Sequence, residues 1–527
     1  MPRQTTILRS HVGIKFNKSS FRRPTDNYIV TSPGMVHEQQ QHRRQQQQLI
    51  TSEPNDELPL NTVSPRNVQK PEDILANLGA RHRQLMMAIV SCSFVWCFGA
   101  LSIMSSAFTT IDCGNCTDSM QTIVSEFDLR GDRSHLTEWS TSFFMVGNMI
   151  GGSTLSCAAD RFGRRPLLLI CLSFQAVFAF LSSLSTSVGT FAICRLLQGA
   201  CYTGSNLVAW VAAYEHTHTD FRWFTTFSFG VTWLIGYSMT ALFAYISSTW
   251  RTMLVWGAAS TFIFTLWCWR FAPETLHFLV SKRRAKGIHK WLIGIDYSPP
   301  HHTVVDDLLQ TQNNNCSSSE KTSFFHEIRV HKIFIVYCLV QLYLWTCDNF
   351  IYFGLSLYST RLAGNTYVNY LLMGAVEMPA YVLSPIFLEK YGTKLVVSGT
   401  HLLASICFLL PAFSAADSWL SLFCWLLGKF SISCSFMSLF VYASEVFPTT
   451  IRNVSVGLCS VLSRGGAIAA PYISLLGSIW PKSPMFLLAS IALAASLLTC
   501  LLPETHKKPL PVSLRQTTAQ SPDLQVS

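Results

Sequence analysis

The chain repeats itself at an interval of 230 residues. The tripeptide Pro-Glu-Thr closes a long apolar stretch at 273–275 and again at 503–505, and 503 minus 273 is 230. Three further residues recur at this interval: Glu215 as Glu445, Arg222 as Arg452, and Trp250 as Trp480. Carriers that hold a solute between two parallel halves of one membrane bundle have this organisation. The repeat therefore predicts a membrane bundle built from two similar halves.

The composition indicates that most of the core is buried in lipid. Hydrophobic residues make up 49% of the 527 residues, charged residues 13%, and the mean hydropathy is +0.29, which a soluble domain of this length rarely shows. A membrane span needs about 20 mainly apolar residues. We expect an all-α membrane protein with twelve transmembrane helices in two pseudo-symmetric six-helix halves. The twelve expected spans start near Leu85, Leu136, Pro166, Thr190, Trp223, Thr252, Ile333, Thr366, Leu395, Trp419, Val454 and Pro484.

These spans divide the chain into five parts. The segment 1–80 is polar, rich in Gln and poor in aromatic residues, so we expect a disordered cytoplasmic tail. The two six-helix halves occupy 81–272 and 333–505, joined by a cytoplasmic central loop over 273–332 and followed by a cytoplasmic tail over 506–527. No secretory signal is visible before the first span, so that span itself must direct insertion.

The distribution of Lys and Arg predicts the orientation. Fifteen of them lie in the loops on one side of the spans and five in the loops on the other. Positive residues stay in the cytoplasm, so both termini and the central loop are expected there. The formal net charge of +10 is then a feature of membrane topology, and no nucleic-acid partner is needed to explain it.

One loop is expected on the outer side. The segment 111–135 contains Asn115 in an Asn-Cys-Thr sequon, which predicts N-glycosylation if that side is lumenal. Cys113 and Cys116 are the only cysteines grouped in such a loop; a lone C-x-x-C spacing is weak evidence for zinc and leaves a local disulfide open.

Charged motifs mark the cytoplasmic turns of both halves. The run Asp160, Arg161, Phe162, Gly163, Arg164, Arg165 is echoed at 389–394 after 229 residues, and Gly163 permits a tight turn. We expect a charged clasp whose salt bridges favour one closed state; a simple positive-inside anchor is the alternative. The residues expected to take part in gating are Asp160, Arg161, Gly163, Arg164, Arg165, Glu215, Arg222, Glu274, Glu389, Lys390, Glu445, Arg452 and Glu504.

These motifs resemble those of a known family. The run DRFGRR resembles the major facilitator signature, while RLLQG at 195–199, PETLHFLVSKRR and VYASEVFPTTIRN are similar to solute carrier family 22, which carries organic cations, anions and zwitterions. FGLSL at 353–357 and VEMPAYVL at 376–383 resemble its carnitine and organic cation branch. The chain departs from the family at Ser156, at Leu276 and His277, and in its short outer loop.

Asp348 is the main candidate for binding a cation. It lies in the middle of the seventh span, and Gln341, Trp345 and Tyr352 share its helical face. Ionisable groups inside spans usually face a cavity or a partner. An acid among aromatic rings suits an ammonium group, because cation–π contacts add to the charge attraction. In the alternative, Asp348 pairs with a basic span residue and Trp345 faces lipid.

Arg464 is the candidate for binding a carboxylate. It lies in the eleventh span among small residues, and its guanidinium can hold a carboxylate with two hydrogen bonds. The resemblance implies that a base here belongs to anion and zwitterion carriers. The alternative is a salt bridge to Glu377 or Asp348. Lys429 suits either role, and Tyr381 replaces a lysine typical of the family's anion carriers.

Several aromatic residues in the spans could line a box for a quaternary ammonium. Most of them are expected to serve packing or the membrane interface, namely Tyr202, Trp233 and Tyr237. We select only Trp210 and Tyr442, which precede the repeated glutamates by five and three residues. His401 is expected to be a packed helix-contact residue and not a proton carrier.

The sequence thus predicts a transporter of small organic cations or zwitterions that works by alternating access, in the plasma membrane, with sodium or a proton as coupling ion. An organic anion carrier using Arg464 and Lys429, a sugar carrier, and a sensor or scaffold that binds without translocating remain alternatives. The span-7 segment VQLYLWTCDNF lacks the Gln-rich signature of sugar carriers. No enzyme motif, cofactor loop or metal-ligand cluster is recognisable, so we expect neither catalysis nor a cofactor.

Overall fold

A computed structural model describes most of the chain between residues 71 and 505. The described residues are 71–79, 82–112, 120–218, 221–295, 304–305, 308–309, 332–362, 364–413, 419–447 and 452–505. The chain divides into two units, Met1–Asn67 and Val68–Ser527, and all described residues belong to the second. Asn115, Cys113 and Cys116 lie outside the described residues, so the predicted glycosylation and disulfide stay predictions.

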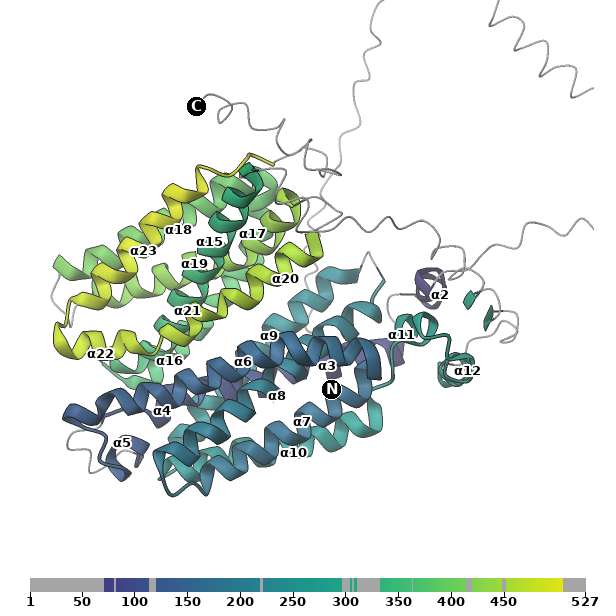
Figure 1. The fold of residues 1–527 in the computed structure, drawn as a ribbon, viewed down its shortest axis with the longest axis horizontal. Helices are drawn as coiled ribbons and strands as arrows, with labels where there is room; N and C mark the ends of the chain where they lie inside the picture. The colour runs from purple at the N-terminus through teal and green to yellow at the C-terminus, as the bar shows by residue number, and fades with distance from the viewer. Residues whose placement is uncertain are drawn as a thin grey trace, which may run out of the picture. The chain divides into compact units, whose positions relative to one another are not determined.

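The described residues form two groups of six spanning helices, coloured from blue to teal and from green to yellow in Figure 1. The first group comprises α3 (Arg83–Met104, extended by α4, Ser106–Thr109), α6 (Ser134–Phe162), α7 (Arg164–Ser183), α8 (Val188–Glu215), α9 (Arg222–Ile246) and α10 (Trp250–Phe271). The second comprises α15 (Lys332–Tyr358), α16 (Thr366–Ala375) with α17 (Glu377–Tyr391), α18 (Thr393–Leu409), α19 (Trp419–Val446), α20 (Arg452–Leu462) with α21 (Arg464–Ala469) and α22 (Tyr472–Ile479), and α23 (Ser483–Thr499). Each span begins within two residues of its expected start.

Nine of these spans, within the part of the chain that the structure describes, are long and apolar enough to cross a membrane by composition alone. The other three are α6 and α8, which carry buried polar residues such as Glu138 and Arg195, and α23, which has 17 residues. Nine and three give twelve. The polar residues of α6 and α8 are accommodated because these two helices pack closely against each other. A Cβ added to Gly147 of α6 would lie 1.9 Å from the carbonyl oxygen of Leu196 in α8. Small residues let the two backbones approach.

The internal repeat is visible in the backbone. α6 ends at Phe162 and α7 begins at Arg164, while α17 ends at Tyr391 and α18 begins at Thr393. The glycine between each pair has a positive φ, 122° at Gly163 and 86° at Gly392, which side chains rarely tolerate. We call the end of the bundle that carries these two turns the signature end.

Three short helices outside the spans pack together: α2 (Pro71–Leu78), α11 (Leu276–Ser281) and α12 (Ala285–Gly294). Ile74 and Leu75 of α2 are buried in this cluster. The prediction of disorder up to residue 80 is therefore wrong for 71–78. Pro71 at the helix start, acidic residues in the first turn and two apolar side chains on one face supply enough signals for a docked helix. The predicted central loop also contains helices.

The two halves touch mainly away from the signature end. The hydroxyl of Thr360, in the short helix η3 (Ser359–Arg361), donates to the carbonyl of Ala107 over 3.0 Å, and that of Ser142 donates to the carbonyl of Ile468 over 2.8 Å. We call this the opposite end.

Candidate functional site

A repeated carboxylate clasp occupies the signature end. In the first half, Glu215 accepts hydrogen bonds from Arg164 at 3.0 Å and from the hydroxyl of Thr275. In the second half, Glu445 accepts from the hydroxyl of Thr505 at 2.6 Å and from that of Thr393 at 2.9 Å. The glutamate and the Pro-Glu-Thr threonine keep the interval of 230, so the repeat preserves the hydrogen bond between them as well as the residue types.

The neighbouring contacts repeat too. The Arg165 guanidinium donates to the carbonyl of Trp269 over 2.8 Å, and the Lys394 ammonium donates to the carbonyl of Cys500 over 2.9 Å. Glu274 accepts the backbone N–H of Arg164 at 3.0 Å. The carboxylate of Glu504 likewise accepts a backbone N–H, from Thr505 at 3.0 Å. In each half the acid of Pro-Glu-Thr therefore accepts a backbone N–H, and in the first half this bond holds the turn at Gly163.

The remaining predicted gating residues lie at the edge of this network or outside it. Asp160 pairs with Arg164 at 3.1 Å, and the Arg452 guanidinium donates to the carbonyl of Phe447. Lys390 lies over the ring of Tyr391. No polar contact to another described residue is found for the exposed side chains of Arg161, Arg222 and Glu389.

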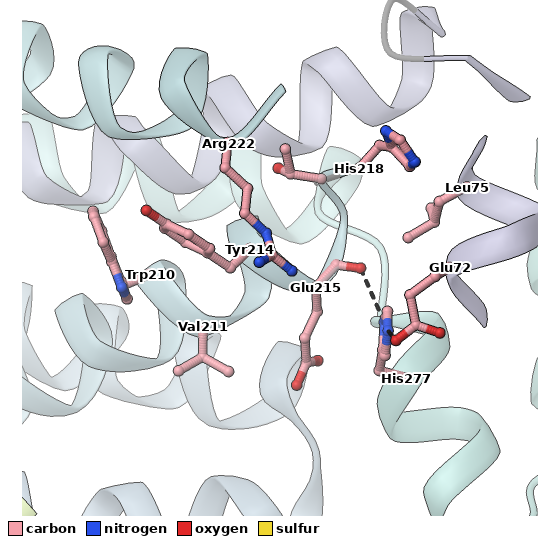
Figure 2. Close-up of a pocket in the computed structure, with 10 residues that line it drawn as sticks. Glu72, Leu75, Trp210, Val211, Tyr214, Glu215, His218, Arg222 and His277 are labelled. Atoms are coloured by element: carbon pink, nitrogen blue, oxygen red, sulfur yellow. Dashed lines mark hydrogen bonds and ion pairs between the residues drawn. The ribbon is translucent and has the colours of Figure 1, made fainter. Parts of the chain in front are cut away.

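A pocket of about 340 Å³ lies beside the first clasp. Figure 2 shows His277 between α2 and the end of α8, with Arg222 and Trp210 on the other side. The His277 ring contacts the carbonyl of Glu215 at 3.1 Å and the carboxylate of Glu72 at 3.3 Å. His277, one of the departures from the family pattern, thus fastens α2 to the clasp.

A buried ion pair lies in the middle of the second half. Lys429 of α19 and Glu377 at the start of α17 are 3.0 Å apart, and both side chains are almost completely buried. Tyr352 and Tyr381 donate their hydroxyls to Glu377 at 2.9 and 2.8 Å. The Lys429 ammonium lies 3.3 Å from the centre of the Tyr352 ring and donates to Ser356. Three predicted residues, Glu377, Lys429 and Tyr352, are therefore brought together.

Asp348 forms a separate buried pair. Its carboxylate lies 3.0 Å from Nε2 of His401 and accepts the hydroxyl of Ser435 at 2.9 Å. Neither Asp348 nor His401 is exposed. The geometry therefore corresponds to the alternative in which Asp348 pairs with a basic residue. Its contact with an ammonium group stays a prediction, one that requires this pair to open.

Trp345 and Tyr442 lie within the packing of the second half. Trp345 is 3% exposed and its ring contacts Phe440 at 4.4 Å, so it does not face lipid. Tyr442 is buried and its hydroxyl donates to the carbonyl of Pro503 at 2.8 Å. The structure does not bring Tyr442 together with the other predicted solute-binding residues. Gln341 is also buried, and its amide has no hydrogen-bond partner among the described residues.

Arg464 is half-buried and has no hydrogen-bonded acceptor in the part of the chain that the structure describes. It starts α21, which packs against α6 of the other half, and Tyr202 of α8 lies within reach of its charge. In the structure neither Glu377 nor Asp348 pairs with Arg464, and these acids bind Lys429 and His401 instead. Arg464 therefore begins a helix that packs against the other half, and no described acid pairs with it.

An aromatic cluster lies in the first half. Trp210 stacks on Trp96 with ring centres 5.3 Å apart, and Trp233 meets Trp96 edge-on at 6.0 Å. The Trp96 indole donates to the carbonyl of Asn206, one turn beyond Tyr202 on α8. The Trp233 indole donates to the Tyr352 hydroxyl over 3.1 Å. The cluster thus connects the two halves and ends at the Glu377 and Lys429 pair.

Sequence reasoning missed several of these residues. The sequence gives no sign that Trp96 belongs to the site, favours packing roles for Trp233 and Tyr202, and does not pair His401 with Asp348. A histidine and an acid both in the middle of spans of the same half were the available signal. Trp96, Trp210 and Trp233 lie far apart in sequence, so no local pattern reveals the cluster.

Possible metal ligands are scarce among the described residues. Cys347, Asp348 and His401 bring ligand atoms within 4.8 Å of one another. The Cys347 thiol points to the carbonyl of Ile491, and the other two side chains bond to each other. We identify none of them as a metal ligand.

Comparison with known proteins places the chain in a family. Residues 84–512 match the sugar (and other) transporter family. A Caenorhabditis elegans protein named as a transporter is 40% identical over 85% of this chain and 91% of its own length. The organic cation transporter protein of Drosophila melanogaster is 31% identical over 75% of this chain and 74% of its own. For the rat organic cation/carnitine transporter 2 the identity is 29%, over 76% and 74%.

Solved structures agree on the fold. The inward-open conformation of the xylose transporter XylE from E. coli superposes with a TM-score of 0.62 at 15% identity, covering 82% of this chain and 98% of that one. The D-xylose–proton symporter superposes with a TM-score of 0.59, also at 15% identity, over 81% and 100%. The chain therefore belongs to the sugar (and other) transporter family of the major facilitator superfamily, and within it to solute carrier family 22.

Proposed function

We propose that this protein moves small organic cations or zwitterions of the carnitine type across the plasma membrane by alternating access. Relatives named organic cation and organic cation/carnitine transporters support the solute class. The repeated clasps support two rigid halves that rock against each other. The excess of Lys and Arg at the signature end supports a cytoplasmic location for that end and for both termini.

One observation carries the proposal. Arg464 is a charged residue inside a span, yet no described protein acid neutralises it. Such a residue normally has a partner, and a solute carboxylate would supply one through two parallel hydrogen bonds. Trp96, Trp210 and Trp233 line the facing half and suit a quaternary ammonium, which aromatic faces attract by about 0.5–2 kcal/mol.

The conformation supports the same cycle. Polar contacts between the halves, such as Arg361 with Glu138 and Thr360 with Ala107, lie at the opposite end. A carrier in this state receives or releases solute at its signature end. Closing that end and breaking the contacts at the other would complete the exchange.

The test compares two solutes in cells that express Arg464 variants. Arg464→Gln should abolish uptake of carnitine, whose carboxylate needs the guanidinium, but should leave at least half of the tetraethylammonium uptake. Arg464→Lys should retain part of the carnitine uptake, because the charge persists without the planar fork. Arg270→Gln, at an exposed position over Phe271, is the control. Unchanged carnitine uptake by Arg464→Gln at equal surface expression would refute the assignment.

An organic anion carrier is the second candidate, favoured by the unpaired Arg464. Lys429 argues against it, since this ammonium already binds Glu377 at 3.0 Å. Inhibition of uptake by dicarboxylates and not by quaternary amines would select the anion carrier. Ligand binding without flux in proteoliposomes would instead select a sensor.

A further inference from the structure

The proposed function leaves the Asp348 and His401 pair unexplained. The two residues come from α15 and α18, are 53 positions apart, and are both fully buried. Two ionisable groups in the interior of a membrane protein cost several kcal/mol unless they neutralise each other. Neither touches Arg464 or the aromatic cluster by any contact found among the described residues. The closed pair therefore points to a role in addition to direct solute binding.

The hydrogen-bond geometry favours one shared proton in the pair. Nδ1 of His401 lies 2.8 Å from the carbonyl of Val397, which can only accept, so Nδ1 carries a proton. Nε2 lies 3.0 Å from a carboxylate oxygen of Asp348. A neutral imidazole with its proton on Nδ1 and an ionised carboxylate would place two lone pairs against each other there. A further proton between Nε2 and the carboxylate removes this clash and makes the pair neutral as a whole.

The surroundings supply no replacement for that proton. The pair is packed among α15, α18, α19 and α23, and α23 contains no ionisable residue. From α19, Ser435 contributes a neutral hydroxyl, and Lys429 is held by Glu377. From α15, Cys347 directs its thiol to Ile491, and Tyr352, one turn from Asp348, donates to Glu377. Among the described residues, no third charge faces the pair.

We infer that Asp348 and His401 form a proton-binding site that couples transport to proton exchange, an inference that rests on the proposed transport function. On release, the bond between the shared proton and Nε2 or the carboxylate oxygen breaks, and the electron pair stays on that atom. The proton passes to water on the open side. The pair then carries one negative charge, and an organic cation entering between the halves supplies the compensating positive charge. Each cation thus exchanges for one proton.

The experiment uses the full chain in liposomes containing a pH-sensitive dye, with labelled tetraethylammonium as probe and the interior at pH 6.5 against pH 7.5 outside. One-for-one exchange should concentrate tetraethylammonium inside by up to about tenfold, because a tenfold proton gradient stores about 1.4 kcal/mol. The interior should become more alkaline as the cation enters. Tetraethylammonium flux that moves no protons would overturn this inference alone. Absence of both tetraethylammonium and carnitine flux would overturn the proposed function, and this inference with it.

His401→Gln tests the pair itself. A lone buried carboxyl keeps its proton, because ionisation without a partner is too costly. Exchange of labelled for unlabelled tetraethylammonium should therefore persist, while the ratio of internal to external tetraethylammonium concentration falls to one. Ser435→Ala, which removes a hydrogen bond to Asp348 but keeps both titratable groups, should still accumulate the cation. Accumulation by His401→Gln at the wild-type level would overturn the assignment.

A second measurement does not depend on that variant folding. Tetraethylammonium added to the purified wild-type protein in weakly buffered detergent should release about one proton per bound cation. Release should also occur with Ser435→Ala. Binding without proton release by the wild-type protein would overturn the inference.

Discussion

Arg361 of the second half and Glu138 of the first half form an ion pair of 3.3 Å across the opposite end. Glu138 is 7% exposed in its side chain, and the Arg361 guanidinium also reaches the carbonyl of Thr110. The closed end of the transporter is therefore held by a charge pair as well as by apolar packing, such as the stacked rings of Tyr237 and Tyr370, whose centres are 4.1 Å apart.

Removing this pair should favour opening of that end. Arg361→Ala leaves Glu138 buried without a partner, which typically costs about 3–5 kcal/mol. We expect faster modification of a cysteine placed at Ala107, which contacts Thr360 in the closed end, by an impermeant maleimide. The double variant Arg361→Ala with Glu138→Gln should be modified less rapidly than Arg361→Ala. Equal rates in the wild-type protein and both variants would show that the pair does not hold the end closed.

The two clasps should respond unequally to loss of their glutamates. Glu215→Gln removes an ion pair with Arg164, whereas Glu445→Gln removes only bonds from hydroxyl groups. Both glutamates accept hydrogen bonds as charged acceptors, but only Glu215 also gains the attraction of a cation, because the donors to Glu445 are neutral hydroxyls. Glu215→Gln should therefore lower the thermal unfolding temperature of the purified protein more than Glu445→Gln does. An equal or reversed order would contradict the asymmetry.

Gly163 should not tolerate a side chain. Its φ is 122°, and a Cβ would meet the Glu274 carboxylate at 2.5 Å. Gly163→Ala should cost about 1–3 kcal/mol and lower the unfolding temperature and transport together. Gly399→Ala is the matched control, because no atom lies within 4 Å of a Cβ in that helix and alanine favours helix. Stability unchanged in Gly163→Ala would contradict the strained turn.

Trp210 should contribute to affinity for quaternary ammonium ions. Loss of its stack on Trp96 in Trp210→Leu should raise the half-saturating tetraethylammonium concentration about 2- to 30-fold, the equivalent of a cation–π contact. Trp210→Phe should have a smaller effect. Trp256→Leu, at a position 52% exposed, should leave the concentration unchanged. A half-saturating concentration unaffected in Trp210→Leu would exclude this ring from the site.

Glu126 predicts a pH dependence at the opposite end. In the short helix α5 (Ile123–Glu126), partial burial by itself would raise the pKa of Glu126, but hydrogen bonds from Arg251 and Trp250 together with the Arg251 charge lower it below the usual value. The carboxylate therefore stabilises the fold above its ordinary pKa of about 4.3, and this stabilisation is lost as the pH falls through the lowered pKa. Glu126→Gln should flatten the dependence of the unfolding temperature on pH below 5. A parallel decline in both proteins would refute it.

Much of the fold could be predicted from the sequence, because span length, positive charge and the repeat are local or periodic signals. The turn at Gly163 and its copy at Gly392 are examples. The docked helix α2 was missed, since its two buried apolar residues, Ile74 and Leu75, follow a long polar tail that dominates the composition.

The site was predictable only in part. Periodicity identified Asp348 and Arg464 as unusual residues inside spans, but it could not tell which acid meets which base. Those partners come from different helices, as His401 and Lys429 show. Residue spacing on one helix carries no information about the rotation of a neighbouring helix, so pairing across helices had to come from the structure.

The span that carries Arg464 is broken into α20, α21 and α22. Its hydrogen-bond ladder tightens at the two breaks, where Gly466 donates to Ser463 and Ile473 donates to Ala470, and Pro471 offers no backbone donor. Each of the three helices can tilt separately, so one end of the transporter can close before the other end opens. The solute is then briefly enclosed by protein on all sides, and no continuous pore crosses the membrane.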